Sequence, residues 1–194
     1  MSGIKVALCG AHGTGKTAAV RALAERLRRE HPKIKVATVT EVARDCPWSL
    51  NEKTVPEAQK WIFHRQIASE LEAAATGAEI ILCDRSVLDN LAYAFVQWKE
   101  AEGKSPWNWP PAYLRLFTDW WEASYDRLWF FQPGAQPLEG DGFRSVNPDF
   151  QARVQEQINW LRRYFLALDW DEDWPGLDEA YAYLKFEIEN PMPF

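Results

Sequence analysis

The feature that most constrains this chain is a glycine-rich stretch near its start, residues 10–17, with the sequence GAHGTGKT. It fits the pattern G-x-x-x-x-G-K-[ST], in which the glycines let the backbone curl so that several N–H groups point at one phosphate. The mainly apolar residues 4–8 predict a buried strand before it, and residues 18–30 predict a helix after it. Strand, glycine loop and helix in this order predict a triphosphate-binding loop; the alternative is a glycine turn without a ligand.

The polar positions of this loop have expected roles. We expect Lys16 to reach the β- and γ-phosphates of the nucleotide, and the Thr17 hydroxyl to hold Mg²⁺. Contacts with the nucleotide are expected along the whole loop, at Gly10, His12, Gly13, Thr14, Gly15, Lys16 and Thr17. Motors, switches and kinases share such a loop, so it predicts a donor site without fixing the reaction.

The composition is that of a globular chain: 194 residues, 47% hydrophobic and 26% charged. This length favours one α/β domain with a full core. The chain has no long apolar run, so we expect no membrane span, no signal peptide and a cytoplasmic location. A net charge of −6 argues against a large nucleic-acid surface but allows a local basic groove. The three cysteines lack C-x-x-C spacing, which favours reduced thiols over zinc ligands.

Predicted strands alternate with predicted helices, which favours a parallel sheet covered by helices on both faces. The expected strands cover residues 4–8, 34–39, 80–83 and 128–131. The expected helices cover residues 18–30, 56–75, 86–100, 113–123 and 148–166, and residues 132–147 predict a mobile loop. Beyond residue 167 we expect one short strand and a helix near 177–188, with the acidic run at 169–173 as a solvated turn.

Polar side chains follow the ends of the predicted strands, where ligands bind in parallel sheets. The first strand leads into the phosphate loop, and the second leads to Glu41 and Arg44. The third leads to Asp84 and Arg85, and the fourth leads to a glycine-rich stretch that contains Arg144. The convergence of four such ends at one edge of the sheet predicts a single active site there.

Each of these residues has a catalytic interpretation and a structural alternative. Asp84 is expected to orient Mg²⁺ or to cap a helix. Glu41 is expected to be the general base, or to form an ion pair with Arg44. Arg85 is expected to hold the acceptor or a phosphate, or to form a structural salt bridge. Arg144 is expected to close on the transferring phosphoryl group as part of a lid, or to be a surface residue.

The acceptor site is expected near Glu41, where aromatic and amide side chains gather in the sequence. A base could be stacked and hydrogen-bonded there, although core aromatics and exposed amides are an equal alternative. Gln59, Phe63 and Gln66 share one face of the predicted helix 56–75. The residues expected to bind the acceptor are Arg44, Trp48, Gln59, Phe63, Gln66, Asp89 and Tyr93.

In combination, these residues resemble the small P-loop kinases of the nucleoside and nucleotide kinase group. The most similar branch is ribosylnicotinamide-kinase-like, and its members are often labelled AAA-type ATPases. The resemblance rests on Gly10 to Thr17, Glu41 with Arg44, Asp84-Arg85-Ser86 through Asp89-Asn90 and Tyr93, and Phe143-Arg144-Ser145. It implies a three-layer P-loop kinase fold with a five-stranded parallel sheet in one domain, residues 1–194. It also implies ATP with Mg²⁺ and a mobile lid at about residues 132–150.

The chain departs from the pattern of this family in two places. Deoxynucleoside kinases carry Glu-Arg-Ser after the third strand, whereas Asp84-Arg85-Ser86 stands here. This replacement leaves open whether Asp84 binds the metal or positions the acceptor. The expected lid carries one arginine, Arg144, where some nucleotide kinases use several, which favours a nucleoside hydroxyl over a nucleoside monophosphate as acceptor.

The sequence thus favours an ATP-dependent kinase with Lys16, Glu41, Asp84, Arg85 and Arg144 as catalytic residues, and Thr17 and Asp84 as metal ligands. One alternative is a kinase of a polynucleotide end or of a hydroxymethylated base in DNA, which the acidic balance disfavours. Another is an NTPase switch with no small-molecule acceptor. The expected partners are ATP and a nucleoside-like or nucleotide acceptor, with no membrane; a homodimer is compatible with the sequence.

Overall fold

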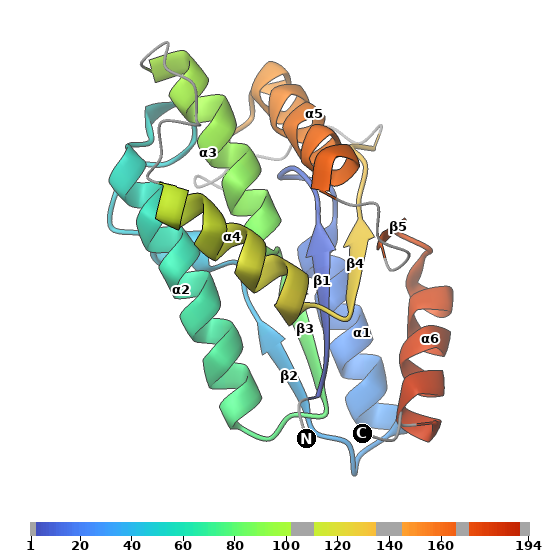
Figure 1. Cartoon of the computed structure of the whole chain (residues 1–194). Helices are drawn as coiled ribbons and strands as arrows, with labels where there is room; N and C mark the ends of the chain where they lie inside the picture. The colour runs from blue at the N-terminus through green and yellow to red at the C-terminus, as the bar shows by residue number, and fades with distance from the viewer. Residues whose placement is uncertain (1–2, 102–110, 135–144, 166–170, 191–194) are drawn as a thin grey trace.

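A single parallel sheet forms the centre of the molecule (Figure 1). The computed structural model describes residues 3–101, 111–134, 145–165 and 171–190. The sheet has five strands in the order β2-β3-β1-β4-β5, and each neighbouring pair is parallel. The strands are β1 Ile4–Cys9, β2 Val36–Val39, β3 Ile80–Asp84, β4 Arg127–Phe130 and β5 Asp171–Asp173. This confirms the predicted parallel sheet.

Helices cover both faces of the sheet and complete three layers (Figure 1). On one face lie α1 (Lys16–Glu30) and α6 (Leu177–Glu189), which share a core with Val6 and Leu8 of β1. On the other face lie α2 (Pro56–Ala75), α3 (Val87–Ala101), α4 (Pro111–Ser124) and α5 (Pro148–Phe165). Two short 3₁₀ helices, η1 (Val42–Asp45) and η2 (Asn51–Lys53), lie between β2 and α2.

The central strands are mainly apolar because both of their faces are buried. In β1, Val6 and Leu8 face the α1 and α6 layer, while Ala7 and Cys9 face the opposite layer. All residues of β3 are buried, as expected for a central strand of a parallel sheet. The three-layer fold therefore follows from central strands whose successive apolar side chains point alternately to one face of the sheet and to the other.

The short strand expected beyond residue 167 is present, but the acidic run that forms it differs from its prediction. It was expected as a solvated turn, but Asp171–Asp173 form β5, which pairs in parallel with β4 at the edge of the sheet. An edge strand needs partners on one side only, so its polar side chains still reach water. Arg162 contacts Asp173 at 2.6 Å, and the indole N–H of Trp129 donates to Glu172 at 3.0 Å. These contacts offset the negative charge that made the run resemble a turn.

Candidate active site

The phosphate loop joins β1 to α1 with a backbone that depends on glycine. Gly10 has φ 146°, and a Cβ there would lie 2.8 Å from the carbonyl oxygen of Phe131. Gly15, at φ 93°, is the N-cap of α1. The glycines therefore permit a close approach of two backbones and a left-handed turn, both of which a side chain would oppose.

Lys16 lies folded across the inside of this loop. Its Nζ donates to the carbonyl oxygen of Ala11 at 2.6 Å and to Thr14 Oγ1 at 3.0 Å. The side chain is buried, and this burial, followed by the nearby charge of Arg85, lowers the pKa of Lys16 to about 8. An anion in the loop would favour the charged form again, so Lys16 is suited to bind phosphate.

Thr17 and Asp84 meet at the same edge of the sheet. Thr17 Oγ1 donates to Asp84 Oδ2 at 2.6 Å. A hydroxyl and a carboxylate are hard oxygen donors that suit Mg²⁺, which usually keeps several waters and takes phosphate oxygens. Within the described ranges, no group of three or more His, Cys, Asp or Glu residues could hold a metal. These residues therefore fit an ion that shares its shell with a triphosphate.

A cavity of about 310 Å³ opens over the loop and carries a strong positive charge. Its lining includes Lys16 with three arginines, Arg21, Arg44 and Arg85, against the one carboxylate of Asp84. The rest of its wall comes from the loop and the start of α1: Gly13, Thr14, Gly15, Thr17 and Ala18. We call this space the donor cavity, because its charge and backbone donors match a triphosphate.

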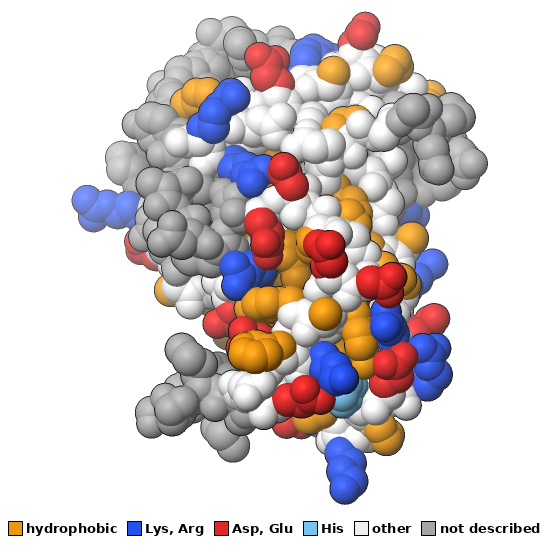
Figure 2. All heavy atoms as spheres, turned by 90° about the vertical axis from the view of Figure 1, so that its right-hand side faces the viewer, with side chains coloured by type: hydrophobic (Ala, Val, Ile, Leu, Met, Phe, Trp, Pro, Cys, Tyr) orange, Lys and Arg blue, Asp and Glu red, His pale blue; other side chains and the backbone are white. Residues whose placement is uncertain are grey.

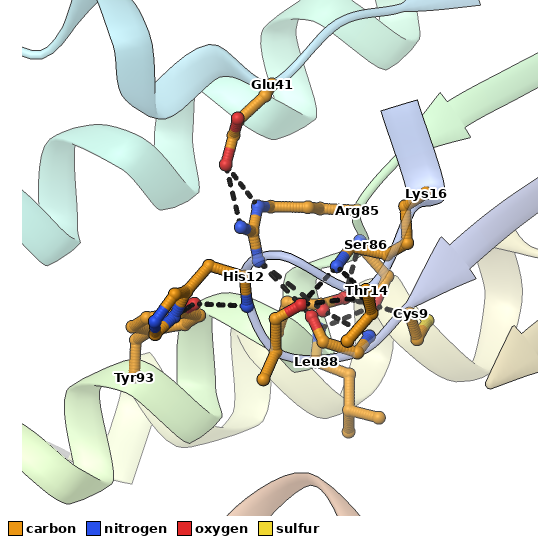
Figure 3. A network of polar contacts seen from close by, with 12 residues as sticks. Cys9, His12, Thr14, Lys16, Glu41, Arg85, Ser86, Leu88 and Tyr93 are labelled. Atoms are coloured by element: carbon orange, nitrogen blue, oxygen red, sulfur yellow. Dashed lines mark hydrogen bonds and ion pairs between the residues drawn. The ribbon is translucent and has the colours of Figure 1, made fainter. Parts of the chain in front are cut away.

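Arg85 and Glu41 form a buried ion pair beside the loop (Figure 3). Arg85 Nε and Nη2 donate to Glu41 Oε1 at 2.8 and 2.7 Å, and Nη1 reaches the carbonyl oxygen of Gly10 at 3.4 Å. Arg44 Nε lies 3.3 Å from Glu41 Oε2. Burial is the largest influence and opposes the charge of Arg85, but Glu41 with Tyr93, Asp89 and Asp84 together outweigh it and raise the pKa of Arg85 well above its usual value. The ion pair of Glu41 with Arg44 and the salt bridge of Arg85, which were the structural alternatives for these residues, are thus both present.

The backbone of Arg85 is unusual for a residue with a side chain. Its φ is 98°, in the left-handed region. Its N–H donates to the carbonyl oxygen of Leu8 at 3.2 Å, and its own carbonyl oxygen accepts from Gln66 at 3.2 Å. Strained backbone of this kind is often found at functional sites. The conformation turns the guanidinium toward Glu41 and the loop.

A second, smaller cavity of about 50 Å³ also has Arg85 in its wall. We call it the acceptor pocket. It is lined by His12, Glu41, Ala43, Leu50, Asn51, Gln59, Ile62, Arg85, Asp89, Asn90, Tyr93 and Gln97. Gln59 Oε1 and Asn90 Oδ1 are buried there without a hydrogen-bond partner among the described residues. Buried acceptors without donors are uncommon in proteins, so they indicate a place where a ligand could donate.

Two predicted acceptor residues, Asp89 and Tyr93, line this pocket and also support the loop. Asp89 Oδ2 accepts from the N–H and hydroxyl of Ser86, and Asp89 Oδ1 accepts from the N–H of Gly10 at 2.8 Å. Ser86 caps α3 in return by accepting from the N–H of Leu88 at 3.1 Å. The hydroxyl of Tyr93 accepts from the N–H of His12 at 3.0 Å (Figure 3).

Other predicted acceptor residues lie elsewhere. Phe63 is fully buried, with its ring stacked 3.7 Å from that of Phe117. Gln66 is also buried, where it donates to Glu70 at 2.9 Å. Trp48 is 42% exposed and lines neither cavity. The shared helix face of Gln59, Phe63 and Gln66 does exist, but it runs from the pocket into the core. Arg144 lies outside the described residues.

Several polar residues of the site were not predicted from the sequence, and three of them are glutamines. Gln97 joins the acceptor pocket by accepting from Gln59 at 2.7 Å and donating to the carbonyl oxygen of Asn51 at 2.9 Å. Gln151 and Gln155 of α5 contact the phosphate loop. Val154 and Ile158 belong to the core face of α5, and Gln155 is a polar residue beside them. A polar residue in that position is the sequence signal that could have identified it.

The side of the molecule that carries α6 has acidic and basic side chains interspersed over the face in view (Figure 2). On this side, Arg26 of α1 contacts Asp178 of α6 at 2.7 Å and Glu30 at 3.3 Å. Mixed signs are typical of a solvated surface and not of one that follows a phosphate backbone. None of the described helices is long and apolar enough to span a membrane.

Comparisons with known proteins agree with this fold. The structure is similar to that of thymidylate kinase from Ehrlichia chaffeensis, with 13% identity, a TM-score of 0.57 and 98% of each chain covered. It is also similar to NadR protein in complex with NR, with 16% identity and a TM-score of 0.71. That match covers 100% of this chain and 54% of NadR, so the chain spans about half the length of NadR. No curated protein matches the chain in sequence.

At these identities the structural likeness concerns the fold, which is that of the P-loop kinases. The sequence itself matches the model of one family over residues 5–165, from β1 to the end of α5. This range includes the phosphate loop and the residues that line both cavities. The chain therefore belongs to the AAA domain family designated AAA_28.

Proposed function

We propose that this chain is an ATP-dependent phosphotransferase that moves the γ-phosphoryl group to a hydroxyl of a nucleoside-like acceptor. The observation that carries this proposal is that two unlike cavities share Arg85 as a wall. The donor cavity is cationic and lies over the phosphate loop, whereas the acceptor pocket is lined by carboxylates and amides. Two substrates of different charge would therefore meet beside one guanidinium.

The donor side would bind ATP through charge and backbone. Lys16 and the N–H groups from Gly13 onward are suited to the β- and γ-phosphates. Thr17 and Asp84 would hold Mg²⁺, which when bound neutralises charge on the phosphates. Arg85 would stabilise the charge that develops on the transferring group, a role that we also propose for Arg144.

The acceptor side would bind a hydroxyl compound that has no phosphate of its own. Arg85 is the only Lys or Arg among the described residues that line the pocket, and Glu41 already pairs with it. Gln59 Oε1 and Asn90 Oδ1 would accept hydrogen bonds from the acceptor. Glu41 would take the proton of the attacking hydroxyl once its contact with Arg44 is exchanged for the acceptor.

A further observation supports phosphotransfer. One of the similar structures is named a thymidylate kinase, so the same fold carries kinase activity elsewhere. Both helix layers and the sheet are built from segments along the whole described chain, which supports one domain. A nucleoside acceptor is favoured over a nucleotide because the acceptor pocket offers so little positive charge.

The test is a transfer assay with γ-labelled ATP against nucleosides, nucleoside monophosphates and single-stranded DNA. We expect label in a nucleoside product, with release of inorganic phosphate in a small minority of turnovers. Label in DNA, with a strong dependence on salt, would indicate the polynucleotide alternative instead. Release of phosphate alone, whatever the acceptor, would indicate an NTPase switch and overturn the proposal.

A further inference from the structure

The first part of the phosphate loop is held by side chains of the protein. The N–H of Gly10 donates to Asp89 Oδ1 at 2.8 Å, and the N–H of His12 donates to the hydroxyl of Tyr93 at 3.0 Å. Between them, the N–H of Ala11 donates to Gln155 Oε1 at 2.9 Å. Three successive donors are thus occupied, and the donor cavity is lined by the loop from Gly13 onward. The loop is divided into a supported part and a phosphate-binding part.

Gln155 differs from the other two supports because it comes from another helix. Asp89 and Tyr93 are on α3, beside the acceptor pocket, whereas Gln155 is on α5 and lines neither cavity. Its Nε2 donates to Gln132 Oε1 at 3.3 Å and to Asn159 Oδ1 at 3.2 Å. Gln132 follows β4 in the chain. One buried amide therefore joins the loop, the stretch after β4 and α5.

A neighbouring glutamine strengthens this connection. Gln151, one turn before Gln155, donates through Nε2 to the carbonyl oxygen of His12 at 2.6 Å. The helix that carries both is fixed in the core by Phe150, Val154 and Ile158, each fully buried. The amide of Gln155 accepts at one end and donates at the other, which an apolar side chain of the same size cannot do.

The contact between Gln155 and Ala11 affects the phosphate-binding part of the loop, because Ala11 also contacts residues of that part. The carbonyl oxygen of Ala11 accepts from Lys16 Nζ at 2.6 Å and from Thr14 Oγ1 at 3.0 Å. A change in the orientation of Ala11 would therefore move the contacts of Lys16 and Thr14. Loss of the Gln155 oxygen would also leave a buried N–H without an acceptor, which favours such a change.

We propose that Gln155 is a positioning residue for the phosphates of ATP, acting through Ala11 on the part of the loop that contains Lys16. It does not touch the nucleotide, and its effect comes from keeping the loop in its phosphate-binding shape before ATP arrives. The inference rests on the proposed function only in taking ATP as the ligand of the loop. It does not depend on the identity of the acceptor.

The test compares Gln155→Met, which keeps the size of the side chain, with Asn159→Ala, which removes a partner of Gln155 without touching the loop. The measurements are the Kd for Mg·ATP and the hydrogen-exchange rate of a peptide covering residues 9–17. For Gln155→Met we expect about tenfold weaker ATP binding and faster exchange in this peptide, with exchange elsewhere unchanged. Asn159→Ala is expected to stay within about twofold of the unmodified protein in both measurements.

ATP binding by a folded Gln155→Met variant within twofold of the unmodified protein would overturn the inference. If that variant does not fold, Gln151→Met takes its place, since Gln151 is less buried and also contacts the loop. ATP binding is then expected to weaken about threefold, because Gln151 is the weaker support. An unchanged affinity for ATP would count against the inference. Failure of the unmodified protein to bind ATP would instead contradict the proposed function, and the exchange measurement would still test the Gln155 contact.

Discussion

The donor cavity and the acceptor pocket share Arg85 in their walls, yet they are built in different ways. The donor cavity comes mostly from one continuous stretch, the loop and the start of α1, and its charge is positive. The acceptor pocket takes residues from the loop, the segment after β2, α2 and α3, and combines carboxylates with amides. A local motif is enough for a phosphate site, whereas recognition of an acceptor needs several elements brought together.

The most severe test of this division is Lys16→Ala. Loss of the cation removes charge stabilisation in the donor cavity, so we expect transfer to fall by about a thousandfold. The measurement is the transfer of label from ATP in a single turnover. Lys185→Ala on α6 is the matched control, because Lys185 is about half exposed and pairs with Glu189 only weakly, at 3.8 Å. Transfer by Lys16→Ala at a rate close to that of the control would contradict the assignment of the donor cavity.

Glu41→Gln tests the boundary between the two sites. The amide keeps the shape but cannot act as a base, so we expect kcat to fall by about a hundredfold or more. The Kd for Mg·ATP is expected to change little, since Glu41 lines the acceptor pocket and not the donor cavity. The two constants are measured on the same preparation. If both worsen equally, Glu41 serves to hold Arg85 and Arg44 instead of taking a proton.

Gln59→Leu examines the acceptor pocket alone. The buried oxygen would be lost together with the amide N–H that donates to Gln97, so we expect the KM for the acceptor to rise about ten- to thirtyfold. ATP affinity should be unchanged, because Gln59 lies outside the donor cavity. Lys60→Ala, at the next position of α2, is the control. A rise in the KM for ATP would show that the two sites are less separate than the structure indicates.

The smallest expected effect is a dependence of ATP binding on pH. The pKa of Lys16 is lowered to about 8 without ligand, and bound phosphate would raise it because phosphate favours the ammonium form. Binding therefore takes up a proton above pH 8 and weakens as the pH rises. We expect the Kd to increase about tenfold between pH 7 and pH 9, measured by titration calorimetry. Lys16→Arg should remove this dependence, since arginine stays charged throughout this range.

The contrast between the two sites also explains what could be predicted from the sequence. The alternation of strands and helices that gives the parallel sheet follows from local patterns, because each short apolar strand and the loop motif are visible within a few residues. The contact of Thr17 with Asp84 then follows from the sheet, since β1 leads to Thr17 and the neighbouring strand β3 ends at Asp84. The pocket residues were predicted less well. Gln59 lines the pocket, but Phe63 one turn away packs on Phe117, a contact between α2 and α4 that helix periodicity cannot indicate.

The place of the edge strand β5 also depends on contacts that its own sequence does not indicate. The acidic composition of residues 169–173 is typical of a turn, because carboxylates favour water. Pairing with β4 and contacts to Arg162 and Trp129 decide its conformation instead. Arg162 is 11 residues from Asp173 and Trp129 is 43 residues from Glu172, so the composition of the run itself did not indicate these partners.

The sequence by itself determined a triphosphate loop between a strand and a helix, and the alternation that builds a three-layer parallel sheet. The reason is physical: the conformation of a glycine, and the burial of successive strand residues on opposite faces of the sheet, depend on residues only a few positions apart in the sequence. The tertiary structure alone decided which polar side chains hold the loop and which acceptor atoms of the pocket lack a donor among the described residues. The contact of Gln155 with Ala11, and the common pocket lined by Gln59 and Asn90, join elements distant in the sequence, and they exist only once the helices have packed on the sheet.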